Sequence, residues 1–138
     1  QPLRVVLDSQ GRLPKTAKIL KQDGDTLVVV KHGVQLHVGA EVLPLDIDEN
    51  GLDLPALLRE LGDRHCNEVL IETGATLAGQ FIKQALVDEM VLYMAPCLMG
   101  SEARPLFQLP ISEMADKKLL NIIDTRMVGD DIRLTIGF

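Results

Sequence analysis

The sequence of 138 residues has no tryptophan, one tyrosine, three phenylalanines and only two cysteines. Cys66 and Cys97 lie far apart without a CxxC pair, and the three histidines do not have zinc-type spacing. We therefore expect no metal site and no disulfide framework. His65 precedes Cys66, but neighbouring side chains point apart and no orienting acid accompanies them, so we do not expect a catalytic pair there.

Long apolar runs and clusters of positive charge are also missing. No apolar stretch reaches the length of about 18 residues that a membrane helix needs, and no secretory signal pattern is present. Acidic residues outnumber basic ones, 20 to 14, which gives a net charge of −6. This balance predicts an acidic protein that binds neither nucleic acid nor membranes. Without a signal peptide, a membrane-length apolar run or a disulfide framework, we expect the chain to be cytoplasmic. The length fits a single domain.

One stretch carries the strongest pattern in the sequence. Val69–Ile71 is a short apolar run, β-branched at both ends, which predicts a buried central strand of a parallel sheet. Apolar residues then recur at the spacing of one helix face, so we expect a helix that begins at or just after Gly74. They are Leu77, Ala78, Phe81, Ile82, Ala85 and Leu86. A further strand over Glu89–Ala95 would complete a right-handed parallel crossover.

The turn between that strand and that helix favours an anionic ligand. A helix N-terminus presents unpaired backbone N–H groups and a positive dipole end, and Gly74 would let a phosphate approach the backbone closely. Thr76 can offer a hydroxyl, and Gly79 can admit close packing. Glu72, at the predicted strand end, can accept hydrogen bonds from a polar substrate. The alternative is that Thr73 or Gly74 only caps the helix while Glu72 is solvated.

The rest of the chain alternates strand and loop patterns. We expect a strand at Leu3–Leu7, ending in a turn at Asp8 and Ser9, and further strands at Thr26–Val30 and Glu41–Leu45, with a polar loop over Lys31–Gly39. A turn is predicted at Asp48–Gly51.

The remaining predicted elements are a helix, a long loop and a hairpin. The helix begins after the cap residue Asp53, with Pro55 in its first turn, and Gly62 is expected to end it. Pro96–Pro110 is expected to be a long loop. The last predicted elements, Lys118–Val128 and Asp131–Ile136, form a hairpin joined at Gly129 and Asp130.

Several of these segments together resemble one enzyme family. The run Val69–Gly79, followed by Leu86–Glu89 and Ala95–Gly100, is similar to the reductase domain of the bifunctional riboflavin-biosynthesis deaminase/reductases. Pro2–Ser9 and Asp53–Leu58 resemble the same family in the same order. The resemblance runs through nearly the whole chain, although Lys15–Asp48 contains little that is specific.

The resemblance implies a three-layer α/β/α, dihydrofolate reductase-like fold. Its sheet would be mixed and mostly parallel, with a C-terminal antiparallel hairpin. Residues 1–138 would form a single domain, the C-terminal part of the reductase domain, without the deaminase domain and without the first strands of the reductase. By analogy with relatives, we also expect a homodimer.

The resemblance also implies an activity and a set of site residues. The activity is the NADPH-dependent reduction of the ribosyl group of 5-amino-6-(5-phosphoribosylamino)uracil, a phosphorylated aminopyrimidine, to its ribityl form. Glu72 would bind the substrate, and no side chain of this chain is assigned a catalytic role. The cofactor-binding residues would be Ser9, Gly74, Ala75, Thr76, Leu77, Ala78, Gly79 and Gln80. Asp8 would repel a 2′-phosphate, so we expect its carboxylate to face a backbone N–H instead.

Two other functions remain open at this point. One is another pyrimidine reductase or dihydrofolate reductase relative of the same fold. The other is a catalytically incompetent fragment that acts as a nucleotide-binding or dimerisation module, which the missing N-terminal segment would favour.

Overall fold

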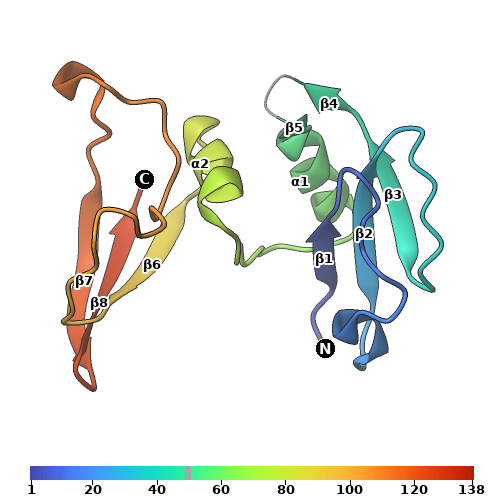
Figure 1. Ribbon diagram of the computed structural model, residues 1–138, viewed down its shortest axis with the longest axis horizontal. Coiled ribbons are helices and arrows are strands. Elements are labelled where there is room, and N and C mark those ends of the chain that lie inside the picture. The colour runs from blue at the N-terminus through green and yellow to red at the C-terminus, as the bar shows by residue number, and fades with distance from the viewer. Residues whose placement is uncertain (49–50) are drawn as a thin grey trace. The chain divides into compact units, whose positions relative to one another are not determined.

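The computed structural model describes residues 1–48 and 51–138, which divide into two compact units, Gln1–Glu68 and Val69–Phe138 (Figure 1). The first unit contains β1 (Arg4–Leu7), a 3-10 turn (Lys18–Lys21), β2 (Thr26–Lys31), β3 (Glu41–Leu45), β4 (Ile47–Asp48), β5 (Gly51–Leu52) and α1 (Leu54–Asp63). The second contains α2 (Ala75–Lys83), β6 (Glu89–Met94), a 3-10 turn (Met114–Asp116), β7 (Asn121–Val128) and β8 (Asp131–Gly137).

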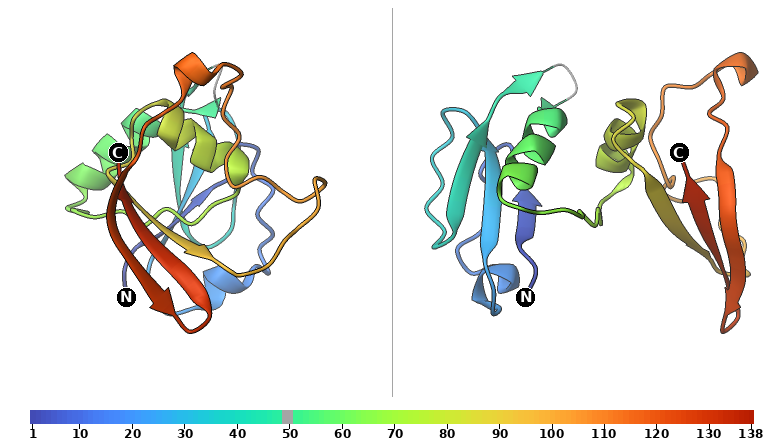
Figure 2. Two further views of the ribbon diagram at one scale, coloured as in Figure 1. Left: turned by 90° about the vertical axis from the view of Figure 1, so that its left-hand side faces the viewer. Right: turned by 180° about the vertical axis from the view of Figure 1, so that it is seen from behind.

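The first unit is built on a parallel sheet of order β1-β2-β3. Its central strand, β2, is apolar on both faces because both faces are covered. Leu27 and Val29 pack against α1, and the alternate residues Val28 and Val30 pack against the loops on the opposite side. Figure 2 shows α1 on one face of this sheet and loops on the other. All four side chains are 0% exposed. The predicted strands Leu3–Leu7, Thr26–Val30 and Glu41–Leu45 are confirmed to within one residue at each end.

Helix α1 begins as predicted and ends differently. Asp53 caps it, its side-chain Oδ1 accepting a hydrogen bond from the backbone N–H of Ala56 at 2.8 Å. The prediction that Gly62 ends the helix is wrong, because Asp63 is the last helical residue. His65 instead takes the left-handed conformation, with φ of 65°, and the Cys66 N–H bonds to the Leu61 carbonyl. A Schellman motif therefore closes the helix without glycine.

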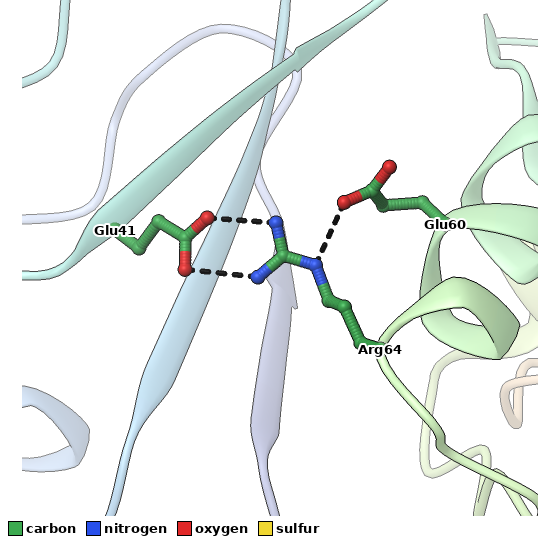
Figure 3. A network of polar contacts seen from close by, with 3 residues as sticks. All are labelled: Glu41, Glu60 and Arg64. Atoms are coloured by element: carbon green, nitrogen blue, oxygen red, sulfur yellow. Dashed lines mark hydrogen bonds and ion pairs between the residues drawn. The ribbon is translucent and has the colours of Figure 1, made fainter.

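One ion-pair network joins the end of α1 to the start of β3 (Figure 3). The Arg64 guanidinium donates to both carboxylate oxygens of Glu41, at 2.7 and 2.9 Å, and to Glu60 at 2.8 Å. These hydrogen bonds, helped by charge attraction, lower the pKa of Glu41 below its usual value. They raise the pKa of Arg64, which remains charged.

The second unit contains an antiparallel sheet of order β6-β8-β7. Gly129 and Asp130 form the turn between β7 and β8, so the predicted C-terminal hairpin is confirmed. In the described part of the chain, these antiparallel strands and the parallel strands of the first unit belong to separate hydrogen-bonded sheets.

The strand predicted at Val69–Ile71 is wrong. Residues 66–74 form no helix or strand, and Leu70 is 84% exposed. A strand needs a hydrogen-bonded neighbour, and none of the strands in residues 1–48 and 51–138 pairs with this segment. The parallel crossover predicted from it is therefore wrong as well, since β6 pairs antiparallel with β8.

The other predictions have mixed outcomes. Helix α2 begins directly after Gly74. The loop predicted over Lys31–Gly39 is confirmed from His32 on, since Lys31 is the last residue of β2. The segment Pro96–Pro110 lacks helix and strand, as predicted. The predicted turn at Asp48–Gly51 falls partly outside the described residues, at Glu49 and Asn50, and the short pair β4 and β5 that flanks it was not predicted.

None of the described helices is both long enough and apolar enough to cross a membrane.

The Arg64 network predicts an acid-dependent loss of stability. Because the pKa of Glu41 lies below its usual 4.5 in the folded chain, its stabilisation is fully present above pH 4.5 and is lost as the pH falls through the folded-state pKa. Glu41→Gln should therefore lower the free energy of unfolding at pH 7, and its difference from the unchanged chain should shrink below pH 4.5.

Urea unfolding over this pH range measures both effects. Glu68→Gln is the control, because Glu68 is exposed in the same unit and has no partner among the described side chains. A Glu41→Gln deficit that stays constant from pH 7 to below pH 4 would contradict the assignment.

Candidate functional site

The first turn of α2 presents unpaired backbone donors. Gly74 is the N-cap residue, with extended backbone angles (φ −82°, ψ 170°), and no side chain caps the helix. The first backbone bond runs from Ala78 N–H to the Gly74 carbonyl, at 3.0 Å. Within the described residues no group accepts a hydrogen bond from the N–H of Ala75, Thr76 or Leu77. These donors and the positive helix end suit a phosphate.

The surroundings of Gly74 leave room for a ligand. A Cβ built at Gly74 has no described heavy atom within 4 Å. Gly74 is exposed, and so is Thr76, in the first turn of the helix. The predicted turn residues Gly74–Gln80 thus lie together on one helix, with its amino end open.

Glu72 lies two residues before that helix but not at the end of a strand. It belongs to residues 66–74, which form no helix or strand, is exposed, and makes no hydrogen bond or ion pair within the described part of the chain. Its carboxylate is therefore available to accept hydrogen bonds from a polar ligand.

The long loop after β6 returns to the first turns of α2 at Gln108. The backbone N–H of Gln108 donates to the Ala75 carbonyl at 3.0 Å, and the Thr76 hydroxyl donates to the Gln108 side-chain oxygen. A Cβ at Gly79 would lie 2.0 Å from the Gln108 carbonyl oxygen. Gly79 therefore does admit close packing, as predicted, and the group that packs there is the chain's own backbone.

Gln80, on the same helix, has an unusual polar atom. Its side-chain Oε1 is inaccessible to solvent and has no hydrogen-bond partner among the described residues. A buried acceptor without a donor costs free energy, so this atom fits a site that a donor would complete. The backbone donors at Ala75–Leu77 by themselves fit the phosphates of a nucleotide cofactor.

The predicted residues Asp8 and Ser9 belong to the first unit, at the carboxyl end of β1. The buried Asp8 carboxylate accepts a hydrogen bond from the backbone N–H of Leu13 at 2.6 Å. The prediction that it faces a backbone N–H is confirmed. The Ser9 carbonyl accepts a hydrogen bond from the N–H of Lys31 at 3.2 Å. The hydroxyl of Ser9, which is half-buried, has no partner within the described segments. Ser9 and α2 lie in different units.

Two pockets lie elsewhere in the described structure. One, of about 260 Å³, lies in the first unit near Thr26 and Glu41, at the amino ends of the parallel strands. The other, of about 250 Å³, is apolar and lies between Ile82 and Phe138 of the second unit. Neither includes a predicted site residue. This is expected for phosphate recognition, which needs outward-facing N–H groups rather than an enclosed cavity.

The sequence model described as the RibD C-terminal domain matches residues 1–133. The chain belongs to the RibD C-terminal domain family. It is 38% identical over 136 residues to the riboflavin biosynthesis protein RibD of Haemophilus influenzae, covering 98% of this chain and 37% of the relative. It is 34% identical to the 5-amino-6-(5-phosphoribosylamino)uracil reductase of Buchnera aphidicola, covering 99% of this chain and 67% of the relative.

Solved structures of RibD proteins share the fold. Form 1 of Acinetobacter baumannii RibD matches with a TM-score of 0.84 and 34% identity, over 97% of this chain and 36% of that one. The reductase Rib7 of Saccharomyces cerevisiae matches with a TM-score of 0.74 at 17% identity, a likeness of fold alone. The predicted α/β, dihydrofolate reductase-like fold class is confirmed. The chain spans a little over a third of the length of the RibD relatives.

Sequence reasoning missed Gln108. It lies in a segment predicted only as a loop, and nothing in its local pattern marks it. The available indication was Gly79, since a glycine inside a helix lowers helix stability and often marks close backbone approach. That indication located the contact on α2 without identifying its partner.

The Gly79 contact predicts a large effect of one methyl group. Gly79→Ala places a Cβ against the Gln108 backbone carbonyl, which cannot rotate away, so it should destabilise the RibD-family chain by about 1–3 kcal/mol. Gly62→Ala is the matched control: this helical glycine has no described atom within 4 Å of its added Cβ. That change should stabilise the chain, by up to about 1 kcal/mol. Equal effects of both changes on urea unfolding would contradict the contact.

Proposed function

We propose that this chain serves the NADPH-dependent reduction of the ribosyl group of 5-amino-6-(5-phosphoribosylamino)uracil to the ribityl form, in riboflavin biosynthesis. The observation that carries the proposal is the set of unpaired N–H groups at Ala75, Thr76 and Leu77, at the open end of α2. The Buchnera aphidicola relative is named as this reductase. A phosphate-binding helix start is what a nicotinamide dinucleotide requires.

The cofactor residues are those of the α2 turn together with Ser9. Gly74 provides room for the diphosphate, and the N–H groups that follow it, in the segment that runs on to Gln80, donate to phosphate oxygens. Ser9 offers a hydroxyl that is not used within the described residues. When bound, NADPH supplies the hydride, and the contribution of the protein is binding, orientation and charge.

Glu72 is the substrate residue in this proposal. Its exposed, unpaired carboxylate can accept hydrogen bonds from the amino groups of an aminopyrimidine or from ribose hydroxyls. Glu72 orients the substrate. No residue of this chain is assigned the transfer of a proton or a bond to the reacting carbon.

Three wider expectations belong to the same proposal. Residues 1–138 act as the C-terminal part of one reductase domain, in the cytoplasm, and the chain works as a homodimer. An exposed apolar strand favours the dimer: every residue of β7 is exposed, including Ile122 and Met127. Exposed apolar edges of this kind pair with partner chains. The same observation favours a non-catalytic dimerisation module as the second candidate function.

Two substitutions separate the cofactor and substrate roles. Gly74→Val fills open space, so the fold should tolerate it, but it blocks the approach of the diphosphate and should weaken NADPH binding at least about tenfold. Glu72→Gln removes one charge-assisted acceptor and should weaken binding of the ribosylaminopyrimidine phosphate by about tenfold, while leaving NADPH affinity within about twofold. Calorimetric titration of the 138-residue chain with each ligand measures both.

Gly100→Val is the control for the first variant, because Gly100 also has no described atom within 4 Å of an added Cβ. The control should bind NADPH like the unchanged chain. Unchanged NADPH affinity in Gly74→Val would reject the phosphate-binding role of this turn. Equal losses of affinity for NADPH and for the substrate in Glu72→Gln would reject the division between cofactor and substrate residues. Failure of the unchanged chain to bind NADPH would favour the non-catalytic module.

A further inference from the structure

Gln108 is the residue outside α2 that contacts the proposed phosphate turn at several points. Its backbone N–H donates to the Ala75 carbonyl, its carbonyl lies against Gly79, and its side-chain oxygen accepts a hydrogen bond from the Thr76 hydroxyl. Two of these contacts use the backbone of Gln108 and do not depend on its side chain. The third contact, to Thr76, depends on the carboxamide.

The Thr76 hydrogen bond has the wrong direction for phosphate binding. A hydroxyl has a single proton, and Thr76 donates it to the Gln108 oxygen. Phosphate oxygens only accept hydrogen bonds. Thr76 can therefore donate to a phosphate only if its proton turns away from the Gln108 oxygen, and the two exposed side chains stay hydrogen-bonded to each other only if Gln108 also changes.

A carboxamide can make that change in place. Its oxygen and its NH₂ group have nearly the same shape, so a half-turn about the last side-chain torsion exchanges an acceptor for a donor at the same position. After the half-turn, Gln108 donates to Thr76 Oγ1, and the Thr76 proton is free to point at the ligand. The contact between the two side chains is kept in both arrangements.

We propose that Gln108 is a positioning residue for cofactor binding, which acts through Thr76 by reversing the direction of their hydrogen bond when a phosphate binds at α2. The inference rests on the proposed function, since it concerns the same turn. It adds a residue that makes no contact with the cofactor and a change that accompanies binding.

A double-mutant cycle tests the coupling. Gln108→Leu keeps the backbone contacts to Ala75 and Gly79 but removes the carboxamide, and it should weaken NADPH binding about three- to tenfold, the range of one hydrogen bond. Thr76→Val removes the hydroxyl and should weaken binding about tenfold. Because Gln108 acts through Thr76, the double variant should bind NADPH no more weakly than Thr76→Val alone.

Two further variants separate positioning from simple structural support. Thr76→Ser keeps a hydroxyl, so it should restore near-normal affinity and the sensitivity to Gln108→Leu. Gln84→Leu makes the same change at the other end of α2 and should leave NADPH affinity unchanged. Thermal unfolding of each variant checks that the fold is retained.

Each outcome supports or overturns a specific claim. Non-additive effects with rescue by Thr76→Ser support the inference. Additive effects of Gln108→Leu and Thr76→Val, or no effect of Gln108→Leu, overturn it and leave the proposed cofactor site in place. Absence of NADPH binding to the unchanged chain overturns the proposed function itself, and the inference with it.

Discussion

The close approach of the Gln108 backbone to Gly79 organises the second unit. Without a Cβ at Gly79, the carbonyl of Gln108 can lie where a side chain would begin, so the long loop after β6 reaches the first turns of α2. Its N–H then donates to the Ala75 carbonyl, and the N–H groups of Ala75, Thr76 and Leu77 have no acceptor among the described residues. One missing methyl group thus permits the loop contact without consuming the donors that the proposed function needs.

The first unit depends on a different constraint, the burial of β2 on both faces. Alternate residues of one strand serve two separate clusters, so helix α1 and the loops on the other face are both fixed by the same segment. The turn after β1 is held in addition by the buried Asp8 carboxylate, which bonds to Leu13. Ser9 therefore follows directly after a residue, Asp8, whose side chain is used to hold the turn.

Sequence patterns predicted the features that depend on local chemistry. The Asp53 cap, the start of α2 after Gly74, the strand β2 and the turn at Gly129 each follow from residues close together in the chain. Val69–Ile71 failed because a strand also needs a partner, and an apolar run does not specify one. The prediction that Gly62 ends α1 failed because the helix ends through backbone hydrogen bonds from the N–H groups of His65 and Cys66, and these bonds form without a glycine at either position.

The same distinction between local patterns and long-range contacts applies within the candidate site. The segment Gly74–Gln80 was found from strand, glycine and helix patterns together with a family resemblance. The long-range contacts of Gln108, and the unpaired Oε1 of Gln80, depend on how distant segments meet and were not visible in the sequence.

The central claim is that the backbone donors at the start of α2 hold cofactor phosphates. Amide chemical shifts of the ¹⁵N-labelled chain, followed during titration with NADPH, test it most directly. The account predicts that, within the second unit, the largest shift changes fall on the N–H groups of Ala75, Thr76 and Leu77, because a phosphate would become their first hydrogen-bond acceptor. Saturable changes confined to the apolar pocket near Phe138, with those three amides unmoved, would contradict it.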